Sequence, residues 1–166
     1  MARIAALDTI DVNTPMGKCL TEWHRILDGD RSAFDALIAD DAVLHSPVIF
    51  KPLPGKETVI LYLTAAAMSF VGEKKPKTEP TDKRTYKLPN GQEWDGRFRY
   101  AREVVGEYDA VLEFETTMNG KYVNGIDMIR CNEAGQIVDF KVMVRPLQAL
   151  EAVRELMVSA LDRLQG

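Results

Sequence analysis

The dipeptide Asn119-Gly120 constrains the fold of this chain more than any other feature of its sequence. Both residues tolerate the positive φ angles of a type I′ turn, which joins two antiparallel strands. On either side of the dipeptide, apolar and polar residues alternate with period two, as is typical of half-buried strands. The stretches 110–118 and 121–131 are therefore predicted to form a β-hairpin.

The alternation continues on both sides of this hairpin. Residues 97–105 precede it, and their apolar face is expected to hold Phe98, Tyr100 and Val104. Residues 137–145 follow it, with Ile137 and Met143 expected on the outer face. The inner face of that last strand is expected to hold Val138, Phe140, Val142 and Val144. Together these strands predict an antiparallel meander.

Helical patterns flank the meander. Thr14-Pro15 is a helix start, because Thr caps the first turn and Pro tolerates its lack of an N–H there. The helix is expected to end before Gly29, and Asp30 to cap a second, short helix that buries Phe34, Leu37 and Ile38. A short strand over 43–48, a helix over about 56–70 and a closing helix after Pro146 complete the pattern. The closing helix is expected to bury Leu150, Val153, Met157 and Leu161. This order predicts an α+β domain.

Length and composition exclude several classes of protein. The 166 residues favour one domain, and 46% apolar with 28% charged residues is typical of a soluble globular chain. A net charge of -4 argues against nucleic-acid binding, which requires a basic face. Two Cys and two His cannot build a disulfide framework, a Cys-rich zinc site or a His-rich metal site. The expectation is a single cytosolic domain over residues 1–166, without metal or cofactor.

The first fifteen residues and the longest apolar run predict neither a signal peptide nor a membrane span. The first fifteen residues carry Asp8 and Asp11 and contain no continuous apolar segment of a signal peptide. The apolar run 59–71 is too short to span a bilayer and is interrupted by Thr64 and Ser69, so it is interpreted as a core helix.

Residues 73–96 differ from the rest of the chain in composition and in apolar pattern. They are rich in Lys and Pro, contain two Gly, and show almost no periodic apolar pattern. A polar stretch of this length is unusual in a compact domain. Two interpretations stay open, a lid and a solvated insertion without a role.

Asp127 is the most informative polar residue. It shares the odd-numbered face of strand 121–131 with Val123, Gly125, Ile129 and Cys131, so it is expected to point into an apolar interior. Burial disfavours the charged carboxylate and raises the pKa, which would let the group hold a proton near neutral pH. Such an acid can donate to an oxyanion or act as general acid or base. The alternative is a purely structural acid paired with a buried Arg or Tyr.

Other chemical motifs are weak or absent. His45 and Ser46 lie on the early strand and are kept as candidate catalytic residues. No nucleophile elbow Gly-x-Ser-x-Gly occurs, and neither phosphate-binding glycine loop is present. The aromatic residues, 8% of the chain, are scattered, so no base-stacking platform is predicted.

The order of these elements resembles the nuclear transport factor 2-like superfamily, also called SnoaL-like, which includes ketosteroid isomerase. Three segments carry the resemblance: 28–48, 54–59 and 125–140 are similar to the family's helix-to-strand segment, third helix start and penultimate hairpin. The resemblance covers residues 15–146, apart from the 73–96 insertion. It implies a cone-shaped, curved antiparallel sheet wrapped by helices around an apolar cavity.

The resemblance also implies roles for single residues. Asp127 matches the carboxylic acid of the isomerase oxyanion hole and would face the cavity. Ser46 falls where the isomerase has its catalytic base, and Glu22 or Trp23 falls where it has a tyrosine. Two of three isomerase residues are therefore replaced, so steroid isomerisation is not supported, and the fold alone does not fix a function.

The sequence thus predicts a domain that binds an apolar or mixed-polarity small molecule, without a cofactor, metal, nucleic acid or membrane. If it is an enzyme, cofactor-free proton transfer of the isomerase, cyclase or dehydratase type is expected. The alternative is a non-catalytic ligand-binding or association module. A homodimer through the outer sheet face is also expected, unless the closing helix covers that face. The expected lining of the cavity is Trp23, Leu44, Ser46, Phe114, Phe140, Val142 and Val144.

Overall fold

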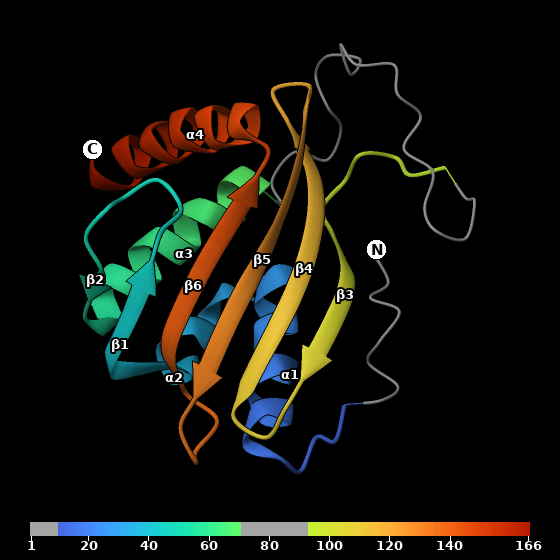
Figure 1. Cartoon of the computed structure of the whole chain (residues 1–166). Coiled ribbons are helices and arrows are strands. Elements are labelled where there is room, and N and C mark those ends of the chain that lie inside the picture. Colours follow the sequence, from blue (N-terminus) through green and yellow to red (C-terminus); the bar gives the residue numbers. More distant parts are fainter. Residues whose placement is uncertain (1–9, 71–92) are drawn as a thin grey trace.

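The computed structural model describes residues 10–70 and 93–166 (Figure 1). The helices of these residues are α1 (Pro15–Leu27), the 3-10 turn η2 (Arg31–Ala33), α2 (Phe34–Leu37), α3 (Lys56–Phe70) and α4 (Leu147–Gln165). The strands are β1 (Ile38–His45), β2 (Leu53–Pro54), β3 (Arg99–Val105), β4 (Asp109–Met118), β5 (Lys121–Cys131) and β6 (Ile137–Arg145). None of the described helices is long and apolar enough to cross a membrane.

The strands form one curved, unclosed sheet in the order β2-β1-β6-β5-β4-β3 (Figure 1). β1 runs parallel to β6, whereas the other neighbours are antiparallel. Helices α1, α2 and α3 lie behind the sheet in Figure 1, on the face that we call the inner face. The opposite face, called the outer face, carries no helix in the described part of the chain. The predicted α+β class and the curved sheet are confirmed.

Local sequence signals predict the bounds of several of these elements correctly. The Thr14 hydroxyl accepts a hydrogen bond from the amide of Gly17 at the start of α1. Asn119 and Gly120 both have positive φ, 48° and 71°, so the predicted hairpin turn joins β4 and β5. The bounds of β5 and β6 match the predicted strands, and α3 matches its predicted range. Polar and apolar periodicity therefore determines most of the architecture.

The predicted start of the first strand was wrong. The short helix ends at Leu37, and β1 begins at Ile38 and ends at His45, rather than running from 43 to 48. Ile38 pairs with Ile137 of β6, so the parallel partner extends the strand toward the helix. Local sequence gives no signal for a partner about 100 residues away.

Two residues, Val104 and Ile137, were predicted to lie on the wrong face of the sheet. Each of them lies close to a register shift. In β3 the register shifts between Tyr100 and Arg102, so Val104 is 60% exposed and the Glu103 side chain is buried. Between β5 and β6 it shifts at Arg130/Cys131, so Ile137 is fully buried opposite Cys131. A bulge of one residue moves every following side chain to the other face.

Helix α4 packs against α3 and approaches β4, β5 and β6. Its buried residues include Val153 and Met157, which also face Val142 of the inner sheet surface across a shared pocket. The alternative in which this helix covers the outer face is therefore wrong. Two of the four residues predicted to be buried on this helix, Leu150 and Leu161, are only half-buried. Ala149, Ala152 and Ala160 are buried in their place.

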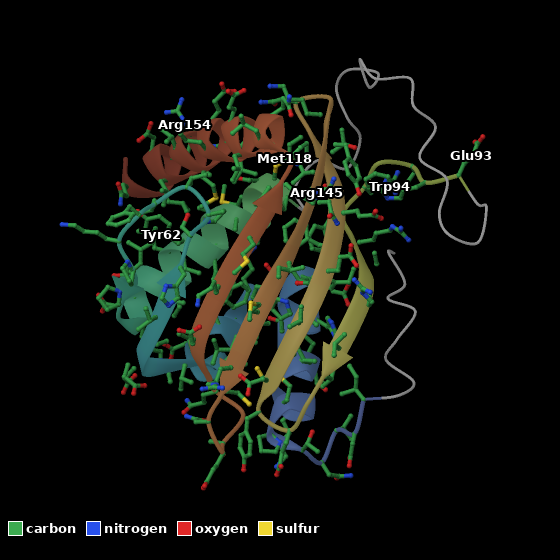
Figure 2. The ribbon with its side chains drawn as sticks, viewed as in Figure 1. Tyr62, Glu93, Trp94, Met118, Arg145 and Arg154 are labelled. Atoms are coloured by element: carbon green, nitrogen blue, oxygen red, sulfur yellow. The ribbon has the colours of Figure 1, made fainter. Side chains whose placement is uncertain are left out.

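Most of the predicted 73–96 insertion lies outside the described residues. Its last four residues are described, and they lead into β3 (Figure 2). The indole of Trp94 packs edge-on against the Tyr122 ring, with centroids 5.9 Å apart, and donates to the carbonyl of Arg97. The choice between a lid and a solvated insertion stays a prediction.

Candidate functional site

Asp127 lies in the middle of β5 on the inner face, as the alternation predicts. It is 7% exposed and sits opposite Leu112 of β4 and Val142 of β6. The register between β4 and β5 is continuous from Asp109 to Met118, so no bulge disturbs the alternation there. The carboxyl group therefore points into the apolar interior, between the sheet and the helices.

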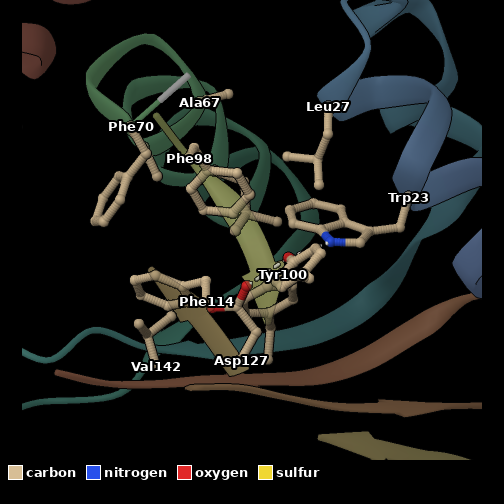
Figure 3. Close-up of a pocket in the computed structure, with 12 residues that line it drawn as sticks. Trp23, Leu27, Ala67, Phe70, Phe98, Tyr100, Phe114, Asp127 and Val142 are labelled. Carbon is tan, nitrogen blue, oxygen red and sulfur yellow. Dashed lines mark hydrogen bonds between the residues drawn. The ribbon is translucent and has the colours of Figure 1, made fainter. Parts of the chain in front are cut away.

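A chain of two hydrogen bonds ends on this carboxyl group (Figure 3). The Tyr100 hydroxyl donates to Oδ2 of Asp127 at 2.7 Å, and Nε1 of Trp23 donates to the Tyr100 oxygen at 2.8 Å. Both bonds are buried. Asp127 is thus the terminal acceptor, and within the described residues Tyr100 is its hydrogen-bond donor. Bonds that run in one direction polarise one another, which strengthens the chain.

Burial and hydrogen bonding act on Asp127 in opposite directions. Loss of solvation raises the pKa of Asp127 to about 7, although the bond from Tyr100 lowers it. Burial and the neighbouring Asp127 carboxylate raise the pKa of Tyr100 well above its usual range, so this phenol stays protonated. One group in the pair can therefore change protonation near neutral pH, and the other remains a donor.

The carboxyl group opens into an apolar pocket, called the first pocket. Its cavity volume is about 60 Å³. Small-molecule sites usually measure about 300–1,000 Å³, so the pocket as it stands has room for only part of a small ligand. Aromatic rings form much of its wall: Phe98 stacks on Phe114, and Phe70 meets Phe114 edge-on. The lining residues are Trp23, Leu27, Leu63, Ala66, Ala67, Phe70, Phe98, Tyr100, Phe114, Asp127, Phe140 and Val142 (Figure 3).

A second pocket of about 40 Å³ lies next to the first. It is bounded by β1, β6, α3, α4 and the residues after β1. Its lining residues are Leu44, Ser46, Pro47, Tyr62, Leu63, Ala66, Phe70, Val142, Val153 and Met157. Four of these also line the first pocket.

The structure brings together some of the predicted site residues and separates others. Asp127, Trp23, Phe114, Phe140 and Val142 line the first pocket. Leu44 and Ser46 line the second pocket, where the Ser46 oxygen accepts from the amide of Val48 at 3.3 Å.

Two predicted residues line neither pocket. Nε2 of His45 lies 3.0 Å from Oδ2 of Asp139. Val144 is half-buried further along β6, opposite Gly125. At the position where the resemblance left a choice, Trp23 faces the pocket, whereas Glu22 forms an ion pair with Arg25.

Sequence reasoning allowed a buried Arg or Tyr as the partner of Asp127, but it did not identify Tyr100 as that residue. β3 and β5 are not adjacent, and β4 lies between them. The curvature of the sheet brings Tyr100 over Asp127, and alternation along single strands carries no information on curvature. The available signal was the pair Phe98 and Tyr100, aromatic residues on one face of a predicted strand.

A buried His–Glu pair was also missed. Nε2 of His24 lies 3.2 Å from Oε1 of Glu103, with side chains 6% and 2% exposed, and the pair has no hydrogen-bond geometry. His24 follows Trp23 on α1, and its ring centroid lies 6.1 Å from that of Tyr100. The pair therefore ties α1 to β3 beside the hydrogen-bond chain. The sequence did not predict that the Glu103 side chain is buried, because the register shift in β3 changes the face on which it lies.

Within residues 10–70 and 93–166, no group of three His, Cys, Asp or Glu side chains is placed to hold a metal ion. The first pocket presents one carboxyl group and one phenol among carbon surfaces. These groups can donate and accept hydrogen bonds, and a carboxyl group can also exchange a proton.

Solved structures resemble most of the chain. A steroid delta-isomerase from Pseudomonas aeruginosa has 28% sequence identity and a TM-score of 0.71, with 99% of this chain and 98% of that chain covered. An uncharacterised protein with a cystatin-like fold from Silicibacter pomeroyi DSS-3 has 25% identity and a TM-score of 0.66, with 87% and 86% covered.

A third structure carries the name of the fold family. It is an NTF2-like protein of unknown function from Mesorhizobium loti, with 19% identity, a TM-score of 0.55, and 82% of this chain and 95% of that chain covered. The sequence matches no known family model and no curated protein. The curved sheet, the helices on one face and these similarities show that the chain has the fold of nuclear transport factor 2-like proteins, as the resemblance predicts.

Proposed function

We propose that this protein catalyses cofactor-free proton transfer on a small neutral molecule bound in the first pocket, in a reaction of the isomerase, cyclase or dehydratase type. The observation that carries the proposal is the buried Asp127 carboxyl group at the end of the Trp23–Tyr100 hydrogen-bond chain. A carboxyl group with a pKa of about 7 exchanges protons efficiently near neutral pH.

The geometry divides the work between the two oxygens of Asp127. Oδ2 accepts from Tyr100, which fixes the plane of the carboxyl group. Oδ1 accepts no hydrogen bond from the described residues, and it is the oxygen available to a ligand. Ionised Asp127 takes a proton from the ligand through Oδ1, and protonated Asp127 returns one. Tyr100 stabilises the carboxylate that is present between these steps.

The wall of the first pocket selects the charge of the ligand. Among its described lining residues there is no Lys, Arg or His. An anionic ligand would be buried beside Asp127 without a compensating cation, which is costly. A neutral molecule with a carbonyl or hydroxyl oxygen avoids this cost, so we assign the substrate to that class.

The steroid delta-isomerase is similar over its whole length, but the similarity does not transfer its substrate. Ser46 stands where the resemblance places the catalytic base, and it lines the second pocket. The first pocket offers a single carboxyl group in the described residues, so Asp127 must serve as both acid and base.

That single carboxyl group also favours a second candidate function. Proton transfer between two carbon atoms is commonly shared between an acid and a base. A pocket with one ionisable acid suits a non-catalytic ligand-binding protein in which Asp127 anchors a ligand oxygen. The two functions differ in whether bound ligand exchanges protons.

Proton exchange on a simple ketone tests the proposal. In D₂O, the protein is expected to accelerate deuterium uptake at the α-carbons of 2-heptanone, measured by NMR. Asp127→Asn should lower the protein-dependent rate by at least about 100-fold, the usual contribution of a general acid or base. Asp162→Asn is the matched control, because Asp162 is exposed on α4. Full exchange by Asp127→Asn would contradict the proposal, and binding without exchange would support the ligand-binding alternative.

A further inference from the structure

The two pockets share a wall and are not separate features of the surface. Leu63, Ala66, Phe70 and Val142 line both of them. Three of these residues project from one side of α3, and Val142 projects from β6 toward them. Each of these four side chains therefore forms part of the wall of both pockets.

All four shared side chains are apolar, and Phe70 is the largest. Its ring is half-buried and lies 5.6 Å from the Phe114 ring, in an edge-on arrangement. Asp127 lies on the first-pocket side of this wall and Ser46 on the second-pocket side. A ligand that touches both residues must therefore pass along apolar surface.

The second pocket offers neutral polar groups only. Its described lining residues include no Asp, Glu, Lys, Arg or His. Its hydroxyl groups are those of Ser46 and Tyr62, and Tyr62 lies on α3 (Figure 2). The Ser46 oxygen accepts one backbone hydrogen bond, which leaves its proton free to be donated. This pocket can therefore bind an apolar segment that ends in an uncharged oxygen.

The closing helix completes the second pocket. Val153 and Met157 of α4 form its wall opposite the sheet, and they are 1% and 8% exposed. These residues are one helical turn apart, so they present one continuous apolar surface. The helix thus contributes to a binding surface as well as to the core.

We infer that the second pocket is a subsite for the distal end of the substrate. The substrate is an elongated, neutral molecule whose reactive oxygen meets Asp127 and whose apolar body passes Phe70 and Val142. Its far end reaches Ser46 between β1 and α4. This inference rests on the proposed function for the orientation of the ligand, but the subsite itself requires only that the ligand binds.

Methyl ketones of increasing length provide the test. Calorimetry would measure the Kd of each unbranched alkan-2-one from 2-pentanone to 2-undecanone with the full-length protein. Each methylene buried in an apolar site tightens binding by up to about 4-fold. The gain should continue beyond the length that the first pocket alone holds, and it should stop when the second pocket is full.

Variants on α4 locate the end of the ligand. Val153→Phe fills the second pocket, so the long ketones should lose at least about 10-fold in affinity and the short ketones should be unaffected. Val158→Phe is the matched control, because Val158 is 50% exposed on the same helix. Since overpacking can destabilise the fold, Met157→Ala serves as the second variant. It enlarges the pocket and should extend the gain to longer ketones.

The outcomes separate the subsite from the chemistry. If Val153→Phe weakens short and long ketones equally, or if Met157→Ala leaves the length dependence unchanged, the inference is overturned. If the length dependence shifts as expected while Asp127→Asn retains proton exchange, the subsite stands and the proposed function fails. If exchange depends on Asp127 but affinity ceases to rise at the length of the first pocket, the proposed function stands without the subsite.

Discussion

The Tyr100 hydroxyl lies 2.7 Å from Oδ2 of Asp127, and it opposes the effect of burial on that carboxyl group. Burial favours the protonated acid, whereas the donated bond favours the carboxylate. The balance leaves the pKa of Asp127 at about 7. Removing the hydrogen bond from Tyr100 tests how strongly it lowers the pKa of Asp127.

Tyr100→Phe should move the pH profile of proton exchange to higher pH. The variant removes the bond that lowers the pKa of Asp127, and burial then acts alone. If the carboxylate is the base, the exchange rate in the wild type rises with pH through about 7. In the variant the midpoint should rise by about one pH unit, the size expected for one hydrogen bond of about 1–2 kcal/mol. A midpoint that stays in place or falls would show that Tyr100 does not act on Asp127.

The free energy of unfolding should also depend on pH because the pKa of Asp127 is raised in the folded protein. The native protein holds a proton on Asp127 up to about pH 7, whereas the unfolded chain releases it near the ordinary pKa of an aspartate, 3.8. The native state therefore binds more protons between these values, so its stability falls as pH rises. The raised pKa corresponds to a loss on the order of 4 kcal/mol across this window.

Asp127→Asn isolates this contribution, because Asn keeps an acceptor for Tyr100 but does not titrate. Urea unfolding at pH 4 and pH 8 would give the free energy of unfolding of both proteins. The wild type should lose several kcal/mol relative to the variant between the two pH values. A constant difference between them would mean that Asp127 titrates normally in the folded protein.

Gly125 tests the packing behind the first pocket. A Cβ at this position of β5 would contact Cζ of Phe114 and would lie 2.5 Å from the carbonyl oxygen of Met143. Backbone cannot yield as a flexible side chain can, so Gly125→Ala should lower the free energy of unfolding by about 1–3 kcal/mol. It should also push the Phe114 ring into the pocket and weaken ketone binding.

Gly106→Ala is the control for this substitution. Its Cβ would meet only the carbonyl oxygen of Asp109, at 3.2 Å, so a much smaller loss of stability is expected. Equal losses in the two variants, measured by thermal unfolding, would show that Gly125 is not a special point of contact.

The sequence determines which residues share a face wherever the strand pairing is regular. The inward direction of Asp127 follows from alternation, because β4 and β5 pair without a shift over their whole length. Val104 and Ile137 lie beside register shifts, and alternation places both on the wrong face. A shift depends on how two strands fit together, so one strand's pattern does not reveal it.

The candidate site depends on a longer-range property. Trp23, Tyr100 and Asp127 come from α1, β3 and β5, and the curved sheet brings them together. The sequence predicts that each lies in a helix or strand and that Asp127 is buried. It cannot predict that Tyr100 reaches across β4, because the curvature arises from the packing of all the strands and helices. The contribution of Val153 and Met157 to a second pocket is hidden for the same reason.

The outer face of the sheet gives the last prediction, a homodimer. Met128 and Met143 are 37% and 49% exposed on adjacent strands of this face, and α4 does not cover them. Adjacent exposed apolar side chains on a sheet are typical of an interface. A two-fold pairing would cover the patch on both subunits at once.

Light scattering after size exclusion measures the assembly directly. At micromolar concentration the wild type should have twice the 18.6 kDa mass of one chain. Met143→Glu should shift it to the single-chain mass, because it places an unpaired carboxylate in the buried interface. Val158→Glu, on the exposed side of α4, should leave the dimer intact. A wild type of single-chain mass would contradict the prediction, and the methionine patch would then face solvent.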